Sequence, residues 1–246
     1  MAKNLHDTHF HLDLFNENLL SLAKKIEQEK IYTIAVTNLP PLYTELIKKL
    51  KVNYKYIRPS LGFHPELIDQ YHNLIPKMWE LLPHARYIGE VGLDYKIGKD
   101  FKTKQITFFE TLIEKCNHQG GKILTIHSRR SADDIISIIG SSFNSKYILH
   151  WYSGSIKTLR VAIENGAYFS INYSMTKSAS GQKIISEIPL NKLLLESDGP
   201  FIKLKEDLFT PLHNKFTVFN ISKLLNISEE KVSNILHDNF KSLIKF

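Results

Sequence analysis

The first expected strand, residues 5–13, carries two histidines that are two residues apart, His9 and His11. In an extended strand, side chains two residues apart point to the same face, whereas on a helix they diverge. Both imidazoles can therefore approach one ion, while Phe10 and Leu12 face the opposite way and can pack against helices. The alternative is a pair of histidines in a polar loop, so the rest of the chain must distinguish the two.

The length and composition of the chain favour one large globular domain. The sequence has 246 residues, 43% of them hydrophobic, and this is about the usual length of a (β/α)8 barrel. We therefore expect a single domain over residues 1–246. The sequence has no apolar run long enough to cross a bilayer and no signal-peptide core, so we expect a cytoplasmic protein with no membrane partner.

The cysteine content and the net charge limit the possible ligands. A single cysteine, Cys116, excludes an intramolecular disulfide and a cysteine-based zinc cluster. Metal ligands would then come from His, Asp and Glu, and Cys116 is typical of a small buried hydrophobe. The net charge of +7 comes mostly from scattered lysines, which are typical of a solvated surface. It permits an anionic substrate such as nucleic acid without identifying one.

Short apolar runs typical of buried strands alternate with segments of helical periodicity along the chain. We expect strands at residues 5–13, 31–37, 56–61, 87–95, 122–127, 146–150, 167–171 and 193–196. The expected helices cover residues 16–30, with Asn16 or Asn18 as the cap, 41–50, 66–82, 102–117, 131–139, with Ser131 as the cap, 155–165, 216–225 and 228–240. This alternation predicts a parallel α/β sheet, and eight strands favour a closed (β/α)8 TIM barrel. An open doubly wound sheet is the alternative, weakened by the absence of a Gly-x-Gly-x-x-Gly turn.

Ionisable residues recur where the expected strands end, and in a (β/α)8 barrel the C-terminal ends of the strands form the active site. These residues are His9, His11, His64, Glu90, Asp94, His127, Arg129, His150 and Asp198. Their chemistry predicts a site for divalent metal. One ion would be shared by the first two histidines and Asp198, a second would be held by His127 and His150, and Glu90 has two oxygens with which to bridge them. Two such ions can support hydrolysis of a phosphate ester.

Six short motifs occur in order along the chain. They are DTHFHLD at 7–13, GFHP at 62–65, IGEVGLDY at 88–95, IHSR at 126–129, HWYSGS at 150–155 and LESDGP at 195–200. Together they resemble the TatD-like metal-dependent deoxyribonucleases of the amidohydrolase superfamily, which are (β/α)8 barrels. The resemblance extends over essentially the whole chain. It implies that the metal ligands are His9, His11, Glu90, His127, His150 and Asp198.

The resemblance also assigns chemical roles. It implies that Asp198 takes a proton from the attacking water, so Asp198 and Glu90 are the expected catalytic residues, and that His64 lies near the substrate. Arg129 can share a face with His127 and clamp a phosphate, or it can form only a surface salt bridge. Asp94 either caps the loop after its strand or anchors a ligand histidine.

The expected cofactors are two divalent metal ions. Four imidazoles among six ligands suit zinc or manganese better than magnesium, whereas the resemblance implies support by magnesium. The expected partner is DNA, single-stranded or at a strand end, because a recessed barrel mouth admits a terminus more easily than a long duplex. This favours exonucleolytic cleavage. Trp151 and Tyr152 can stack on a base, although packing in the core is the favoured interpretation.

Two departures from the resembling family concern the substrate cleft. Arg130 follows Arg129 where the family commonly has an acidic residue, and FIKLKEDL at 201–208 replaces an Arg-Gly-Lys-x-Asn-Glu-Pro-like stretch. Residues 11–15 and 62–67 are similar to the TatD-type nuclease of a bacterial anti-phage system, which implies partner proteins from that system. The alternatives are a small-molecule amidohydrolase and a partner-dependent subunit of a defence complex.

Overall fold

The computed structural model describes residues 5–51, 54–96 and 101–245. Strands and helices alternate along this part of the chain. The parallel strands are β1 (His6–Phe10), β2 (Tyr32–Ala35), β3 (Ile57–Pro59), β4 (Tyr87–Asp94), β5 (Ile123–Arg129), β6 (Lys146–His150), β7 (Tyr168–Ile171) and β8 (Leu193–Leu195). The helices are α1 (Leu19–Gln28), α2 (Pro40–Leu50), α3 (Ile75–Leu81), α4 (Lys102–Gln119), α5 (Ala132–Ile139), α6 (Ile156–Glu164), α7 (Ala179–Glu187), α8 (Asn214–Leu225) and α9 (Glu229–Ile244).

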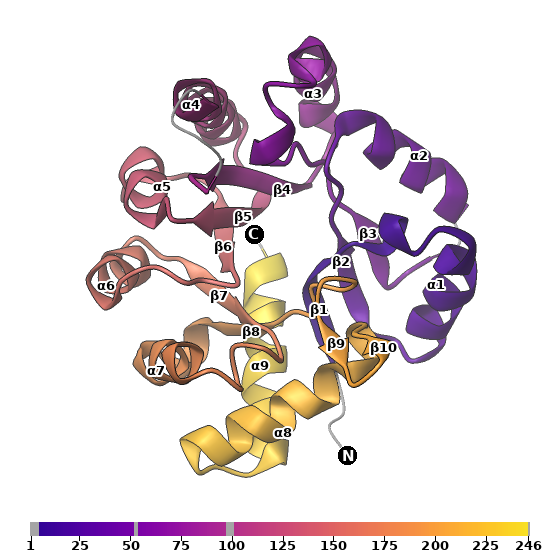
Figure 1. The fold of residues 1–246 in the computed structure, drawn as a ribbon, viewed down its shortest axis with the longest axis vertical. Coiled ribbons are helices and arrows are strands. Elements are labelled where there is room, and N and C mark those ends of the chain that lie inside the picture. The colour runs from indigo at the N-terminus through magenta and orange to yellow at the C-terminus, as the bar shows by residue number, and fades with distance from the viewer. Residues whose placement is uncertain (1–4, 52–53, 97–100, 246) are drawn as a thin grey trace.

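The strands form a ring in chain order, with the helices α1 to α7 around it (Figure 1). Hydrogen bonding divides the ring into a sheet of β1 to β3 and a sheet of β4 to β8. A bridge between Leu61 and Ile88 joins β3 to β4. At the other seam, after β8, the amide of Asp198 donates to the carbonyl of His9 at 3.0 Å. The expected (β/α)8 barrel is confirmed, and the open doubly wound sheet is wrong.

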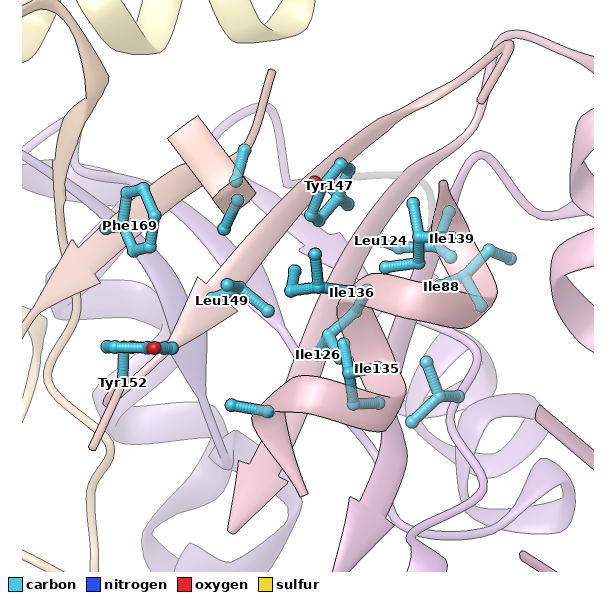
Figure 2. Packing of buried hydrophobic residues seen from close by; sticks show 14 of the residues in the cluster. Ile88, Leu124, Ile126, Ile135, Ile136, Ile139, Tyr147, Leu149, Tyr152 and Phe169 are labelled. Atoms are coloured by element: carbon cyan, nitrogen blue, oxygen red, sulfur yellow. The ribbon is translucent and has the colours of Figure 1, made fainter. Parts of the chain in front are cut away.

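Side chains on the strands alternate between the barrel interior and the surrounding helices. On β5, Leu124 and Ile126 point outward against α5, as Figure 2 shows. The apolar stripe of α5 that receives them includes Ile135, Ile136 and Ile139, which lie at helical spacing. Each fully buried aliphatic side chain of this kind contributes about 1.5–3 kcal/mol. This outer layer holds the strands in place while their inward-facing positions remain available for polar chemistry.

Helix α9 closes the end of the barrel at which the strands begin. Its Phe240 and Leu243 pack in one apolar cluster with Tyr87 and Ile123, which begin β4 and β5. The Phe240 ring also stacks on His6 at a centroid distance of 4.6 Å. With this end packed, the C-terminal ends of the strands are left to form the site.

Three local expectations at the ends of elements need correction. β1 ends at Phe10 and not at residue 13, because the 3-10 helix η1 (Leu12–Asn18) follows at once. Asn18 precedes α1, but its side chain accepts no hydrogen bond from the helix. The Ser131 hydroxyl does not cap α5; it donates to the carbonyl of Leu93 and so ties the end of β5 to β4.

Other elements differ from the sequence expectation in extent or were not expected. The helical segments expected over 66–82 are α3 and the short 3-10 helices η3 (Pro65–Leu67), η4 (His72–Leu74) and η5 (Leu82–His84). Helix α7 was not expected, and neither was the antiparallel hairpin of β9 (Lys203–Leu204) and β10 (Asp207–Leu208). The remaining 3-10 helices are η7 (Leu190–Lys192) and η8 (Pro211–His213).

Two further sequence expectations can be compared with the described residues. Cys116 is fully buried in the layer between the strands and the helices, as expected for a small hydrophobe. No helix in the described part of the chain is long and apolar enough to cross a membrane.

Lys122 is a buried cation that ties β5 to the segment before β4. Its ammonium donates to the carbonyls of Leu82 at 2.8 Å, Ala85 at 2.7 Å and Pro83 at 3.4 Å. Replacing Lys122 with alanine should lower the free energy of unfolding by about 2–4 kcal/mol, because these carbonyls lose their donor. Urea denaturation measures the change, with the exposed Lys24→Ala as control. A loss equal to that of the control would contradict the structural role.

Candidate functional site

The C-terminal ends of the strands bring six ionisable side chains into one buried cluster. Their backbone positions lie on β1, β4, β5 and β6, directly after β1 and in the loop after β8, which are far apart in sequence and reach the same end of the ring. The six are the expected metal ligands His9, His11, Glu90, His127, His150 and Asp198. The structure therefore places the complete expected ligand set in one location.

Glu90 lies at the centre of this cluster. Its Oε2 is 3.5 Å from Nε2 of His9 and 3.3 Å from Nε2 of His11. Its Oε1 is 2.8 Å from Nδ1 of His127 and 3.0 Å from Nε2 of His150. Each carboxylate oxygen therefore faces a different pair of imidazoles, which is the arrangement that a bridging carboxylate requires.

The first half of the cluster has the separations expected of ligands to one cation. The Nε2 atoms of His9 and His11 are 3.2 Å apart, and Oδ1 of Asp198 lies 3.7 Å and 3.6 Å from them. Bonds of about 2.0–2.2 Å to a single ion put neighbouring ligand atoms roughly 3–3.6 Å apart. Thr125 fixes the His9 ring, because its hydroxyl lies 3.1 Å from Nδ1. These residues fit a divalent cation.

The second half of the cluster contains one residue more than expected. His64 was expected near the substrate, yet its Nε2 lies 3.4 Å from Oε1 of Glu90, beside His127. Burial alone would raise the pKa of Glu90, but the imidazoles of His64, His9 and His150 outweigh it and hold this pKa well below its usual range. Glu90 is therefore ionised and ready to bind cations, and His64 is a further candidate ligand.

Asp94 combines the two roles that the sequence left open. Its Oδ2 is 2.7 Å from Nε2 of His127, and its Oδ1 accepts the amide of Lys96 at 2.7 Å. Burial disfavours the imidazolium of His127, but the carboxylates of Asp94 and Glu90 outweigh burial and raise the pKa of His127 to about 9. Arg129, whose side chain is 48% exposed, lies 3.9 Å from Asp94. Asp94 thus aims Nδ1 of His127 at the cluster.

Glu196 is a buried carboxylate that the sequence analysis did not single out. Its Oε1 accepts the amide of Trp151 at 3.1 Å and the Nδ2 group of Asn172 at 2.8 Å, and its Oε2 accepts the hydroxyl of Ser170. Oε2 also lies 3.7 Å from Nδ1 of His150. The available signal was an acidic residue inside the LESDGP motif at the end of an apolar strand. Glu196 positions the β6 end of the site.

Negative charge is crowded where β8 meets β1. Burial and the carboxylates of Glu196, Glu90 and Asp7 raise the pKa of Asp198 well above its usual value. Burial likewise raises the pKa of Glu196 to about 8 and that of Asp7 to about 7. A bound divalent cation would relieve this repulsion, which is a second reason that the residues fit a metal.

A close backbone contact holds Glu90 in position. The Glu90 amide donates to the carbonyl of Thr37 at 3.1 Å. Gly62 passes so near this carbonyl that an added Cβ would lie 1.6 Å from the Thr37 oxygen. Only glycine therefore allows the loop after β3 to approach β4 here, which explains the first residue of the GFHP motif.

A cavity of about 500 Å³ opens above the cluster. Beside the expected ligands His11, Glu90, His127, His150 and Asp198, it is lined by His64, Asp94 and Arg129, and by Trp151 and Phe201 at its mouth. Trp151 is 36% exposed, whereas Tyr152 is buried in the core, as the packing interpretation had it. The three residues expected to contact the substrate, His64, Asp94 and Arg129, therefore all border this cavity.

Comparison with known proteins is consistent with this site. The family model described as TatD related DNase matches residues 6–245. The metal-dependent hydrolase YabD of Bacillus subtilis is 28% identical over 98% of this chain and 99% of its own length. A metal-dependent hydrolase of Buchnera aphidicola is 30% identical over 96% of this chain and 97% of its own. The crystal structure of the TatD homologue YJJV from Escherichia coli superposes with a TM-score of 0.85 at 19% identity, covering 99% of this chain and 98% of that one.

Proposed function

Because the chain belongs to the TatD related DNase family, whose relatives include metal-dependent hydrolases, we propose that it is a divalent-metal-dependent phosphodiesterase acting on DNA. The observation that carries the proposal is the position of Glu90, whose two oxygens face two separate pairs of imidazoles. When bound, two divalent ions would supply Lewis-acid activation of water and neutralise charge on the phosphate.

The six candidate ligands would be shared between two ions. His9 and His11 would hold one ion with Asp198, and His127 and His150 the other, with Glu90 shared between them. Zinc, manganese and magnesium remain the candidate ions, and the four imidazoles favour the first two. His64 would assist the second ion or the substrate from the same side.

Asp198 is the proposed general base. This is the role that the resemblance to the TatD-like nucleases implies for Asp198, and a positioned carboxylate can accept a proton from water. The Asp198 carboxylate also borders the cavity in which the substrate would lie. Its position supports the proposal that Asp198 contacts a cation and receives a proton from the attacking water.

The shape of the site favours attack from a strand end. The cavity of about 500 Å³ is of the size that takes a small group such as a terminal nucleotide. Arg129 borders it with a half-exposed guanidinium, a group suited to hold a phosphate by paired hydrogen bonds. We therefore propose exonucleolytic cleavage of single-stranded DNA.

The proposed biological setting is bacterial anti-phage defence. It rests on the resemblance of residues 11–15 and 62–67 to the TatD-type nuclease of such a system, and it implies partner proteins. Activity of the isolated protein on DNA must be established before a role in defence can be tested.

Nucleotide release from end-labelled single-stranded DNA tests the proposed function. We expect mononucleotides to appear only when manganese, zinc or magnesium is present, and to fall by roughly 10³-fold in Asp198→Asn, which loses the base. Closed circular single-stranded DNA is the matched substrate without ends and should survive. Cleavage of the circle would contradict the terminal mode, and no release with any of the three metals would overturn the nuclease proposal in favour of a small-molecule substrate or a partner-dependent subunit.

A further inference from the structure

Two solvent-exposed aromatic side chains stand at the mouth of the site cavity. Phe201 is 61% exposed and Trp151 is 36% exposed. Among the large exposed hydrophobic side chains of the described residues, these two alone line the cavity. Exposed aromatic surface of this kind does not contribute to the core, and beside the cavity it is available to contact a ligand.

Both rings are attached to fixed points of the site. Trp151 directly follows His150, and its amide is bound by the buried Glu196 at 3.1 Å. The amide of Phe201 donates to the carbonyl of Asp198 at 3.0 Å, and its ring meets the His11 ring edge to face at a centroid distance of 5.1 Å. The Phe201 ring and the backbone of Trp151 are therefore held at set positions relative to the ligand cluster, as a precise binding site requires.

The polar and apolar parts of the cavity suit the two parts of a nucleotide. The ionisable cluster and Arg129 line the cavity and would take the phosphate, while Phe201 and Trp151 line the same cavity with exposed aromatic surface. Aromatic side chains stack on every base, because each base has a π-face, so this contact is tolerant of sequence. A paired base in a duplex is already stacked on its neighbours, whereas an unpaired terminal base is free to exchange partners.

We propose that Phe201, with Trp151, forms a stacking platform for the terminal base of a single DNA strand. This rests on the proposed function and adds the determinant that selects a base-bearing, unpaired end.

Cleavage of two oligonucleotides by wild type and by Phe201→Ala tests the proposal. The oligonucleotides are identical except that one ends in a normal nucleotide and the other in an abasic nucleotide. We expect wild type to favour the normal end by about tenfold or more in kcat/KM. The variant should lose this preference through a raised KM on the normal end, with kcat little changed and with the abasic end cleaved as before. Phe201→Tyr should restore the preference, because it keeps the ring.

The control variant is Phe219→Ala, which removes a 44%-exposed phenylalanine from α8, away from the cavity. It should leave the kinetics on both oligonucleotides unchanged. If Phe201→Ala loses equal activity on both, the ring acts only through His11 and the stacking proposal is overturned.

Binding without turnover separates this proposal from the proposed function. Oligothymidylate added to the metal-free protein should quench the fluorescence of Trp151, and Phe201→Ala should weaken this binding by about tenfold. Trp151→Phe should remove the quenching and leave only the signal of Trp79. Absence of cleavage together with this quenching would reject the nuclease and keep the platform, whereas cleavage with no quenching and no preference for a base would reject the platform alone.

Discussion

Glu90→Gln should reduce DNA hydrolysis by roughly 10³-fold or more. The substitution keeps the size of the side chain but removes the charge and one acceptor oxygen, so the two halves of the cluster lose the carboxylate between them. If the proposed pair of ions is bound, the metal content should fall from two ions to one or none per chain. Initial rates of nucleotide release and metal content by atomic emission measure the two effects on the same preparation.

The matched control for this substitution is Glu80→Gln, which makes the same chemical change at an exposed residue paired with Lys77. It should keep both the rate and the metal content of wild type. Thermal melting of metal-free Glu90→Gln shows whether the fold survives. Full metal occupancy with near-normal rates in this variant would mean that Glu90 is not the bridging ligand.

Removal of divalent metal with EDTA should lower the melting temperature by about 5–15 °C. A ligand present at 100 to 1,000 times its Kd stabilises a protein by about 2.7–4.1 kcal/mol, and each kcal/mol moves the melting temperature of a chain of this size by about 2–4 °C. The physical reason is the crowding of Asp198, Glu196 and Asp7, whose pKa values are raised in the folded protein. Calorimetry with and without added manganese measures the shift.

Asp198→Asn provides the internal control for the effect of metal. The variant removes one charge from the crowded region, so its metal-free form should melt at a higher temperature than metal-free wild type. Added metal should then stabilise it less, since one ligand is missing. Identical melting of wild type with and without metal would contradict the assignment of the cluster as a metal site.

The position of the ligand set could be predicted because it depends on topology and not on side-chain packing. Once the candidate ligands lie at the C-terminal ends of parallel strands in one barrel, the ring must bring them to one end, whatever the detailed path of each loop. To predict that His9, His11 and His150 meet, it was enough to know the strand to which each belongs and the face toward which it points. This part of the site follows from periodicity together with chain order.

The surroundings of the ligands could not be predicted in this way. His64 follows β3, and its distance from Glu90 depends on the close passage of Gly62 beneath the Thr37 carbonyl. Glu196 acts through hydrogen bonds to side chains on β7 and to the backbone after β6, which no sequence pattern reveals. These contacts join residues of different strands in ways that local spacing does not encode.

The missed elements have a local cause. Helix α7 contains Ser, Gly and Gln where a typical amphipathic helix has longer apolar and charged residues, and its clearest signal is the Ser178 side chain that accepts the Gly181 amide. The β9–β10 hairpin has only two residues per strand, too few for an alternating pattern. Short or weakly patterned segments of this kind are specified by their neighbours more than by their own residues.

The packing of Phe240 on His6 makes the first strand depend on a helix that is distant in sequence. β1 carries His9, yet the apolar residues beneath that strand belong in part to α9. Without α9, the base of the ring would be open and its apolar residues would be in water. We therefore expect a chain cut before α9 to lose the support of β1 and, with it, the positions of His9 and His11.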